Sequence, residues 1–315
     1  MELIYNYGFF LLKTITILAA VLVVISAIVS QKRKSPGELL SECLNEGIQT
    51  QKQKLTKKYK LKRMKKEKKV DLKNRPKAYI VDFKGDIKAS QTEQLREEIT
   101  TILSIFQPGD EVMIRIDSPG GAVNGYGFAA SQLERLRNNN IYFSVCIDQI
   151  AASGGYLMAC IANRIYAAPF AIIGSIGVVA QLPNLHKWLK KHDIDFEQIT
   201  AGEYKRTLTI FGENTEEGRK KFREDLQLIH TNFKNQVSTY RPQLNIETVA
   251  TGEHWLARDA LQLGLVDDLK TSDDWVLEKT ETFQVIQLQK TKNLSFQEKL
   301  FKPVAKFFDQ INCAK

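Results

Sequence analysis

A serine between small residues is the first group in this sequence that could act as a nucleophile. The stretch DQIAASGGYLMACIANRI, residues 148–165, places Ser153 before two glycines and an apolar run. This pattern predicts a strand, a tight turn and the first turn of a helix. There, the N–H of Gly154 and the helix dipole would favour developing negative charge. Close packing of small residues is the alternative explanation of the same pattern.

A second glycine-rich turn, DSPGGAV, occupies residues 117–123 after an alternating apolar segment. Pro119 restricts the residue before it to extended backbone, and Gly120 and Gly121 allow a sharp turn and the close approach of a ligand. A helix is predicted to follow, so backbone N–H groups would point into the same space, as an oxyanion hole or an anion site requires. A phosphate loop is disfavoured because neither GK[ST] nor GxGxxG occurs here.

A serine nucleophile needs a base that accepts its proton. Lys205, in TAGEYKRTLTIFG, lies 52 residues after Ser153 among apolar and aromatic residues. A lysine acts as a base only when burial or positive neighbours favour its neutral form, which the sequence alone does not show. His186 and His192 are the alternative bases, although their charged, amphipathic surroundings are typical of solvated histidines.

The elements around these turns alternate between strands and helices. Four apolar runs predict strands, at residues 78–83, 111–117, 141–148 and 165–168. Helical spacing recurs between them, which favours an α/β domain with an at least partly parallel sheet. From Thr215, a predicted N-cap, the chain reads as mainly helical. The long apolar stripe over residues 222–240 fits a core helix or a subunit interface.

A long uncharged segment lies near the N-terminus. Residues 14–30, TITILAAVLVVISAIVS, would span about 26 Å as a helix, enough for a thin hydrocarbon core. A cleaved signal peptide is disfavoured because Glu2 and no basic residue precede Lys13, and no small-x-small cleavage site precedes Gln31. We therefore expect a retained membrane anchor. QKRK at residues 31–34 favours a cytoplasmic location for the rest of the chain.

Positive charge is concentrated in one stretch of the chain. Residues 51–77 hold 14 Lys and Arg against two acidic residues, a net +12, so the remainder carries −3 of the total of +9. A linker that contacts anionic lipid headgroups is the favoured interpretation. Nucleic-acid binding is disfavoured because Tyr59 is the one aromatic residue interleaved with these lysines.

The cysteines and histidines show no disulfide or metal pattern. The four cysteines lack CxxC spacing, and Cys146 and Cys160 lie in apolar runs that predict buried thiols. The four histidines are scattered without an HxxxH pair. We therefore expect neither a metal nor an organic cofactor.

Five short motifs follow one another in an order that is typical of one protein family: DSPGG, ASGGY, IYAAP, GSIGVV and YKR. With them the chain resembles the signal peptide peptidase A-like serine peptidases, and in particular their short SohB type, over about residues 77–267. The anchor and the basic linker resemble that type as well. The resemblance implies an α/β, Clp-protease/crotonase-like fold with an N-terminal transmembrane helix.

The resemblance also implies a Ser-Lys dyad. Matched motif by motif, the site residues are Ser153 as nucleophile, Lys205 as general base, Gly121 and Gly154 as oxyanion donors, and Ser175 and Gly120 in support. The family further implies a ring-like homo-oligomer, in which the lysine reaches the serine within one protomer or from its neighbour.

We therefore expect four parts in the chain. They are a membrane anchor with its basic flank (1–34), a basic linker (35–76), a peptidase domain (77–270) and a C-terminal extension with an amphipathic helix (271–315). The expected function is that of a membrane-anchored serine endopeptidase of the bacterial inner membrane, which cleaves residual signal peptides or membrane-proximal polypeptides. Its expected partners are these substrates, membrane lipids and further copies of the chain.

Three questions stay open at this point. The resemblance implies action at the outer, periplasmic face of the membrane, whereas the QKRK flank favours the cytoplasmic face. A crotonase-like acyl-CoA enzyme would share the fold, but it would explain neither the anchor nor the pair Ser153 and Lys205. A non-catalytic membrane scaffold would also share the fold, but it would not require both of these residues.

Overall fold

The computed structural model describes residues 7–18, 39–58, 72 and 74–290. The chain divides into two units, Met1–Leu40 with Lys290–Lys315, and Ser41–Gln289. In the first unit, residues 7–18 form a helix. Within the described ranges, no helix is long and apolar enough to cross a membrane, so the expected transmembrane helix is not found there. The expected anchor lies outside these ranges from residue 19 onward, as do part of the basic linker (35–38, 59–71 and 73) and the whole C-terminal amphipathic helix.

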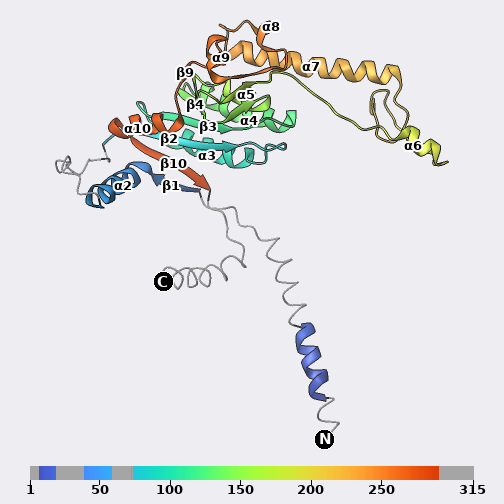
Figure 1. The fold of residues 1–315 in the computed structure, drawn as a ribbon, viewed down its shortest axis with the longest axis horizontal. Coiled ribbons are helices and arrows are strands. Elements are labelled where there is room, and N and C mark those ends of the chain that lie inside the picture. The colour runs from blue at the N-terminus through green and yellow to red at the C-terminus, as the bar shows by residue number, and fades with distance from the viewer. Residues whose placement is uncertain (1–6, 19–38, 59–71, 73, 291–315) are drawn as a thin grey trace. The chain divides into compact units, whose positions relative to one another are not determined.

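A seven-stranded sheet lies at the centre of the described part of the larger unit (Figure 1), in the order β1-β10-β2-β3-β4-β6-β9. Its strands are β1 (Leu39–Cys43), β2 (Lys77–Lys84), β3 (Glu111–Asp117), β4 (Phe143–Ile147), β6 (Arg164–Ala167), β9 (Asp268–Leu269) and β10 (Gln284–Lys290). From β10 to β9, each strand runs parallel to its neighbour. The central strands are buried, apolar runs, as expected of a parallel sheet that is covered on both faces. The expected mixed α/β fold is confirmed.

Helices connect these strands. They are α2 (Leu44–Lys58), α3 (Thr92–Ile105), α4 (Val123–Asn138), α5 (Gly154–Ala159), α6 (His186–Lys191), α7 (Glu216–Tyr240), α8 (Ile246–Val249), α9 (Ala257–Gln262) and α10 (Ser272–Thr282). The expected cap of α7 is confirmed, because Oγ1 of Thr215 accepts a hydrogen bond from the N–H of Gly218 (3.1 Å). The buried residues of α7 are Phe233 and Val237, so this helix contributes to the core in its C-terminal part.

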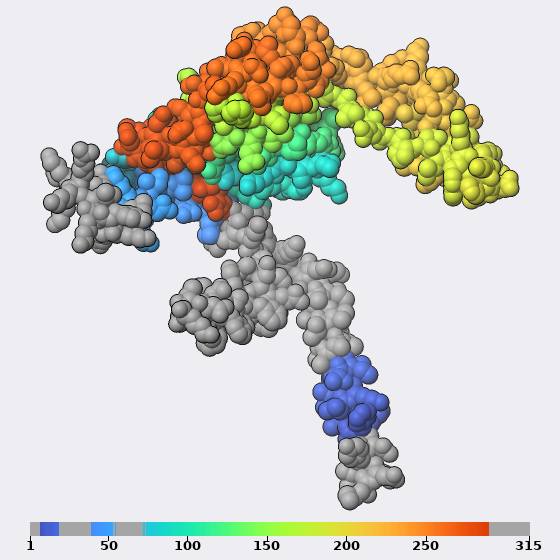
Figure 2. Space-filling view, in the orientation of Figure 1, coloured from blue at the N-terminus to red at the C-terminus, as the bar shows by residue number. Residues whose placement is uncertain are grey.

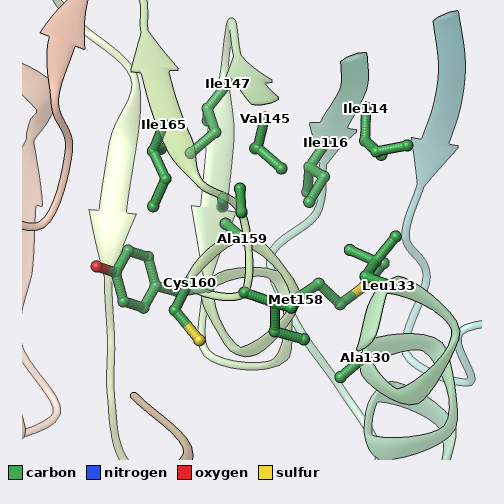
Figure 3. Close-up of a cluster of buried hydrophobic side chains, with 14 of the residues drawn as sticks. Ile114, Ile116, Ala130, Leu133, Val145, Ile147, Met158, Ala159, Cys160 and Ile165 are labelled. Carbon is green, nitrogen blue, oxygen red and sulfur yellow. The ribbon is translucent and has the colours of Figure 1, made fainter. Parts of the chain in front are cut away.

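The main hydrophobic core lies between the sheet and helices α4 and α5 (Figure 3). Strand residues such as Ile114 and Val145 face Leu133 of α4 and Met158 of α5, and all four are fully buried. Well-packed interiors of this kind resist displacement of their elements. The packing of α5 therefore also fixes the position of residue 153, which precedes the helix.

A second, three-stranded sheet consists of β5 (Ile150–Ala152), β7 (Ile172–Gly174) and β8 (His254–Leu256). Strand β5 runs parallel to β7, and β8 runs antiparallel to β7. Ser153 follows β5 directly, and Ser175 follows β7. This small sheet thus places the two serines of the expected site on neighbouring strand ends.

The larger unit extends into both stretches that flank the expected peptidase domain. Helix α2 lies in the stretch expected as a linker, and β10, in the expected C-terminal extension, lies between β1 and β2. The buried Asn45 joins the two, since its Nδ2 donates to the carbonyl oxygens of Thr280 and Phe283 and its Oδ1 accepts from the N–H of Val285. Residues from both flanks therefore stabilise the sheet edge.

The segment between β7 and α7, which we call the arm (residues 175–215), extends away from the sheet (Figures 1 and 2). It is held together locally, because the N–H of Leu185 donates to the carbonyl oxygen of Ile210 (2.7 Å) and the rings of Phe196 and Phe211 lie 5.6 Å apart. Several large apolar side chains of the arm remain exposed, among them Val179 and Ile199.

Candidate active site

Ser153 lies between β5 and α5 with a backbone conformation that favours glycine. Its φ is 51° and its ψ is −117°. Its N–H donates to the carbonyl oxygen of Gly174 (2.8 Å), and its own carbonyl oxygen accepts from the N–H of Leu157 (2.9 Å). A residue held in such a sparsely populated region costs about 1–3 kcal/mol and persists only where its surroundings enforce the conformation. The expected strand–turn–helix position of Ser153 is confirmed.

The two glycine turns meet beside this serine. A Cβ on Gly120, whose φ is 89°, would lie 2.7 Å from Cβ of Ser153 and 2.8 Å from the backbone nitrogen of Gly154. A Cβ on Gly121 would overlap the carbonyl group of Ile87. Within the described part of the chain, the N–H groups of Gly121 and Gly154 have no hydrogen-bond partner. Both N–H groups are therefore available to an oxyanion.

A chain of three hydrogen bonds holds the first turn. The N–H of Gly120 donates to Oγ of Ser118 (3.1 Å), and this oxygen lies 2.6 Å from Oη of Tyr126. Since the Tyr126 hydroxyl donates its single proton to the carbonyl oxygen of Asp86 (2.9 Å), Ser118 is the donor between them. The buried Tyr126 ring also contacts Gly154, where an added Cβ would overlap it. One side chain therefore supports both glycine turns.

A cavity of about 950 Å³ opens at Ser153. Five of the six expected site residues line it: Gly120, Gly121, Ser153, Gly154 and Ser175. Ser175 also has a positive φ of 51°, and its N–H donates to the carbonyl oxygen of Glu253 (2.6 Å). Helices α4 and α7 form much of the remaining wall, so the serine faces a space that is large enough for a peptide segment.

Lys205, the sixth expected residue, does not line this cavity. It lies in an exposed turn of the arm, where its N–H donates to the carbonyl oxygen of Gly202 (3.1 Å). The adjacent ring of Tyr204 lies 5.5 Å from Nζ of Lys221 on α7, so the turn packs against the beginning of α7. The structure of the single chain therefore leaves Lys205 outside the cavity that Ser153 lines.

His230 is a residue of the same cavity that the sequence does not indicate. It lies on α7, lines the cavity, and its Nε2 is 3.3 Å from the carbonyl oxygen of Ile176. The alternative bases His186 and His192 lie at the two ends of α6 and do not line the cavity. His230 lies within the span of the apolar stripe, residues 222–240, but helical spacing alone does not reveal which part of α7 lines the cavity.

Metal-ligand clusters and reactive cysteines are the next groups to consider at this site. Among them, no group of three His, Cys, Asp or Glu side chains is placed to hold a metal ion. The expected burial of Cys146 and Cys160 is confirmed. Burial raises the pKa of Cys160 to about 12, which keeps this thiol protonated and unreactive at neutral pH.

Known proteins are similar to this chain over most of its length. Family models match residues 2–133 (Peptidase family S49 N-terminal) and residues 135–285 (Peptidase family S49). A relative described as "Probable protease SohB", from Haemophilus influenzae, is 47% identical over 314 residues, which cover 91% of this chain and 89% of that protein. A relative with the same description, from Buchnera aphidicola subsp. Schlechtendalia chinensis, is 45% identical over 305 residues, or 89% of this chain and 100% of that protein. The chain therefore belongs to peptidase family S49 and is a protease.

Proposed function

We propose that this protease is a serine endopeptidase with Ser153 as its nucleophile. The observation that carries the proposal is the meeting of two glycine turns at one serine of positive φ, in the wall of a peptide-sized cavity. Oγ of Ser153 would attack the scissile carbonyl carbon while its proton passes through a base to the leaving amine. The C–N bond breaks, and water then hydrolyses the acyl-enzyme ester. The N–H groups of Gly121 and Gly154 would stabilise the oxyanion of each tetrahedral intermediate.

The proposed base is Lys205 of a neighbouring protomer. Lys205 lies on an arm whose apolar side chains face solvent, with Val179 80% and Ile199 95% exposed. Apolar surfaces of this kind are typical of protein contacts. A ring-like homo-oligomer would cover the arm and bring the lysine to the next protomer's Ser153. The contact would also exclude water from the amine, as a lysine base requires, and the Ser175 hydroxyl would orient it.

We also propose that residues 14–30 anchor the peptidase in the bacterial inner membrane and that its substrates are residual signal peptides or membrane-proximal polypeptides. The support is the uncharged length of this stretch, the basic residues 51–77 and the bacterial origin of the SohB relatives. A reporter protein fused after Lys315 would show on which side of the membrane the peptidase domain lies.

A fluorophosphonate probe, with casein cleavage as a second readout, tests the nucleophile and the base. We expect Ser153→Ala and Lys205→Ala to lose labelling and cleavage, while His230→Ala keeps both. If Ser153→Ala cleaves as well as the wild type, the proposal is wrong. If His230→Ala loses labelling and Lys205→Ala keeps it, the base is His230.

Co-expression of the two inactive variants tests whether protomers share a site. In a ring of randomly mixed Ser153→Ala and Lys205→Ala protomers, about one site in four pairs an intact serine with its neighbour's intact lysine. About a quarter of the wild-type activity should therefore return. No recovery would place the lysine in the same protomer as its serine. A non-catalytic scaffold would show no activity in any of these experiments, and an acyl-CoA enzyme would act on thioesters but not on casein.

A further inference from the structure

The cavity at Ser153 continues between α4 and α7 as far as a carboxylate, Glu134. Along α4 its wall runs from Val123, beside the first glycine turn, to Glu134. These residues are eleven positions apart, or about 16 Å along a helix. An extended peptide advances about 3.3 Å per residue, so this wall has the length of about five substrate residues.

Glu134 gives this cavity an uneven charge. Among the described residues that line the cavity, Glu134 is the only carboxylate, and no lysine or arginine is present. Apolar side chains contribute to its wall from three elements, among them Val123 of α4, Leu157 of α5 and Phe233 of α7. The cavity therefore combines apolar walls with one negative end.

The carboxylate of Glu134 is held in place by two donors and forms no ion pair within the described residues. Its Oε1 accepts hydrogen bonds from Nε2 of Gln236 (2.6 Å) and from the hydroxyl of Tyr240 (3.2 Å). Burial, and next the charge of Glu134, raise the pKa of Tyr240, so this donor keeps its proton. Both donors use the same oxygen, and within the described residues Oε2 has no partner.

The nearest cations on these helices have other partners. The guanidinium of Arg137 lies 5.6 Å from the centre of the Tyr240 ring. Arg135 donates to Oε1 of Gln132 (3.1 Å) and to Oγ1 of Thr100 (2.9 Å). Neither forms an ion pair with Glu134 among the described residues, so a cation from the substrate would meet an unpaired carboxylate oxygen.

We propose that Glu134 selects substrates that carry a lysine or arginine within about five residues of the scissile bond. The ammonium or guanidinium would donate to Oε2, and the apolar walls would accept apolar side chains closer to Ser153. This inference rests on the proposed function, because the cavity is a substrate site only if Ser153 is the nucleophile. The substrate class is thus an apolar segment with one nearby basic residue.

A lysine scan in fluorogenic peptides tests this selection on the full chain. One lysine is moved through five positions on each side of the cleaved bond of an otherwise apolar peptide, and norleucine at the same position is the control. One charge-assisted hydrogen bond corresponds to about a tenfold change in rate, so we expect one position at which lysine raises kcat/KM about tenfold. The advantage should disappear in Glu134→Gln. It should persist in Glu247→Gln, which removes a carboxylate that pairs with Lys234 outside the cavity.

Other outcomes would overturn the inference. If no position favours lysine over norleucine, or if Glu134→Gln keeps the preference, Glu134 does not select the substrate. Replacing arginine by neutral citrulline in the peptide tests the same charge without any protein variant, should Glu134→Gln fail to fold. Fluorophosphonate labelling of Ser153 in the same samples separates the two proposals. Labelled protein without a basic preference contradicts the role of Glu134 alone, whereas unlabelled wild-type protein contradicts the nucleophile.

Discussion

Removing the Tyr126 hydroxyl should slow catalysis without weakening substrate binding. In Tyr126→Phe the ring still packs against Gly154, but the Ser118 hydroxyl and the Asp86 carbonyl each lose a partner. Each lost buried hydrogen bond costs about 1 kcal/mol, and an unsatisfied partner about 1–3 kcal/mol, so we expect about 2–3 kcal/mol of destabilisation. Because the Ser118 hydroxyl is then no longer held by Tyr126, we expect the Gly120 turn to loosen and the Gly121 N–H to move from the position proposed for the oxyanion.

The kinetic consequence follows from the role of that N–H. Losing one oxyanion donor costs about 100- to 1000-fold in kcat, and a misplaced donor costs less. We therefore expect kcat to fall about 10- to 100-fold in Tyr126→Phe while KM changes about twofold at most, since the interaction is made in the transition state. Initial rates on a fluorogenic peptide give both constants, and thermal unfolding of the same samples gives the stability.

Tyr156→Phe is the matched control for this experiment. Tyr156 is also fully buried, and its hydroxyl donates to the carbonyl oxygen of Leu265 (2.9 Å), but it does not line the cavity. We expect the Tyr156→Phe variant to lose about as much unfolding free energy as Tyr126→Phe but to keep the wild-type kcat. The reasoning is refuted if the two variants lose kcat equally, or if Tyr126→Phe keeps the wild-type kcat while its stability falls.

Three further predictions concern other parts of the molecule. Gly120→Ala should abolish probe labelling, because its Cβ would lie 2.7 Å from Cβ of Ser153 at a φ of 89°, whereas Gly47→Ala, with open space around it, should label normally. The backbone and side chain of Ser90 lower the pKa of Asp86, so Ser90→Ala should raise that pKa toward its ordinary value in an NMR titration. The stabilisation from this turn should accordingly be present at neutral pH and be lost as the pH falls through the lowered folded-state pKa. Cys160 should resist alkylation at pH 7 until the protein is unfolded in denaturant, and rapid native-state modification would contradict its burial.

Much of the main sheet was predictable because its strands are long, apolar and buried. The runs at residues 78–83 and 111–117 correspond to β2 and β3, and the cap at Thr215 begins α7. The three-residue strands of the small sheet are too short to show any period. Strand β10, QVIQLQK, alternates polar and apolar residues, and nothing local indicates that it pairs with β2, more than 200 residues earlier.

The residues of the candidate site also fall into two groups, those that local sequence patterns indicate and those that only the packing of distant elements brings to the cavity. Ser153 and the glycines were identified because tight turns and close backbone contacts restrict the residue types locally to small ones. Glu134 and His230 reach the cavity only through the packing of α4 against α7, which no local pattern encodes. Lys205 lies in the arm outside the cavity, so the resemblance could name the residue but not place it.

The positive φ of Ser153 lowers the folding stability of this protein at the position on which its proposed activity depends. The conformation that presents the serine is one that glycine adopts without strain. Ser153→Gly should therefore be inactive and yet unfold at a higher temperature than Ser153→Ala, in which the strain remains. Drift toward greater thermal stability at this one position would remove the proposed nucleophile, so selection for proteolysis would have to act directly on Ser153.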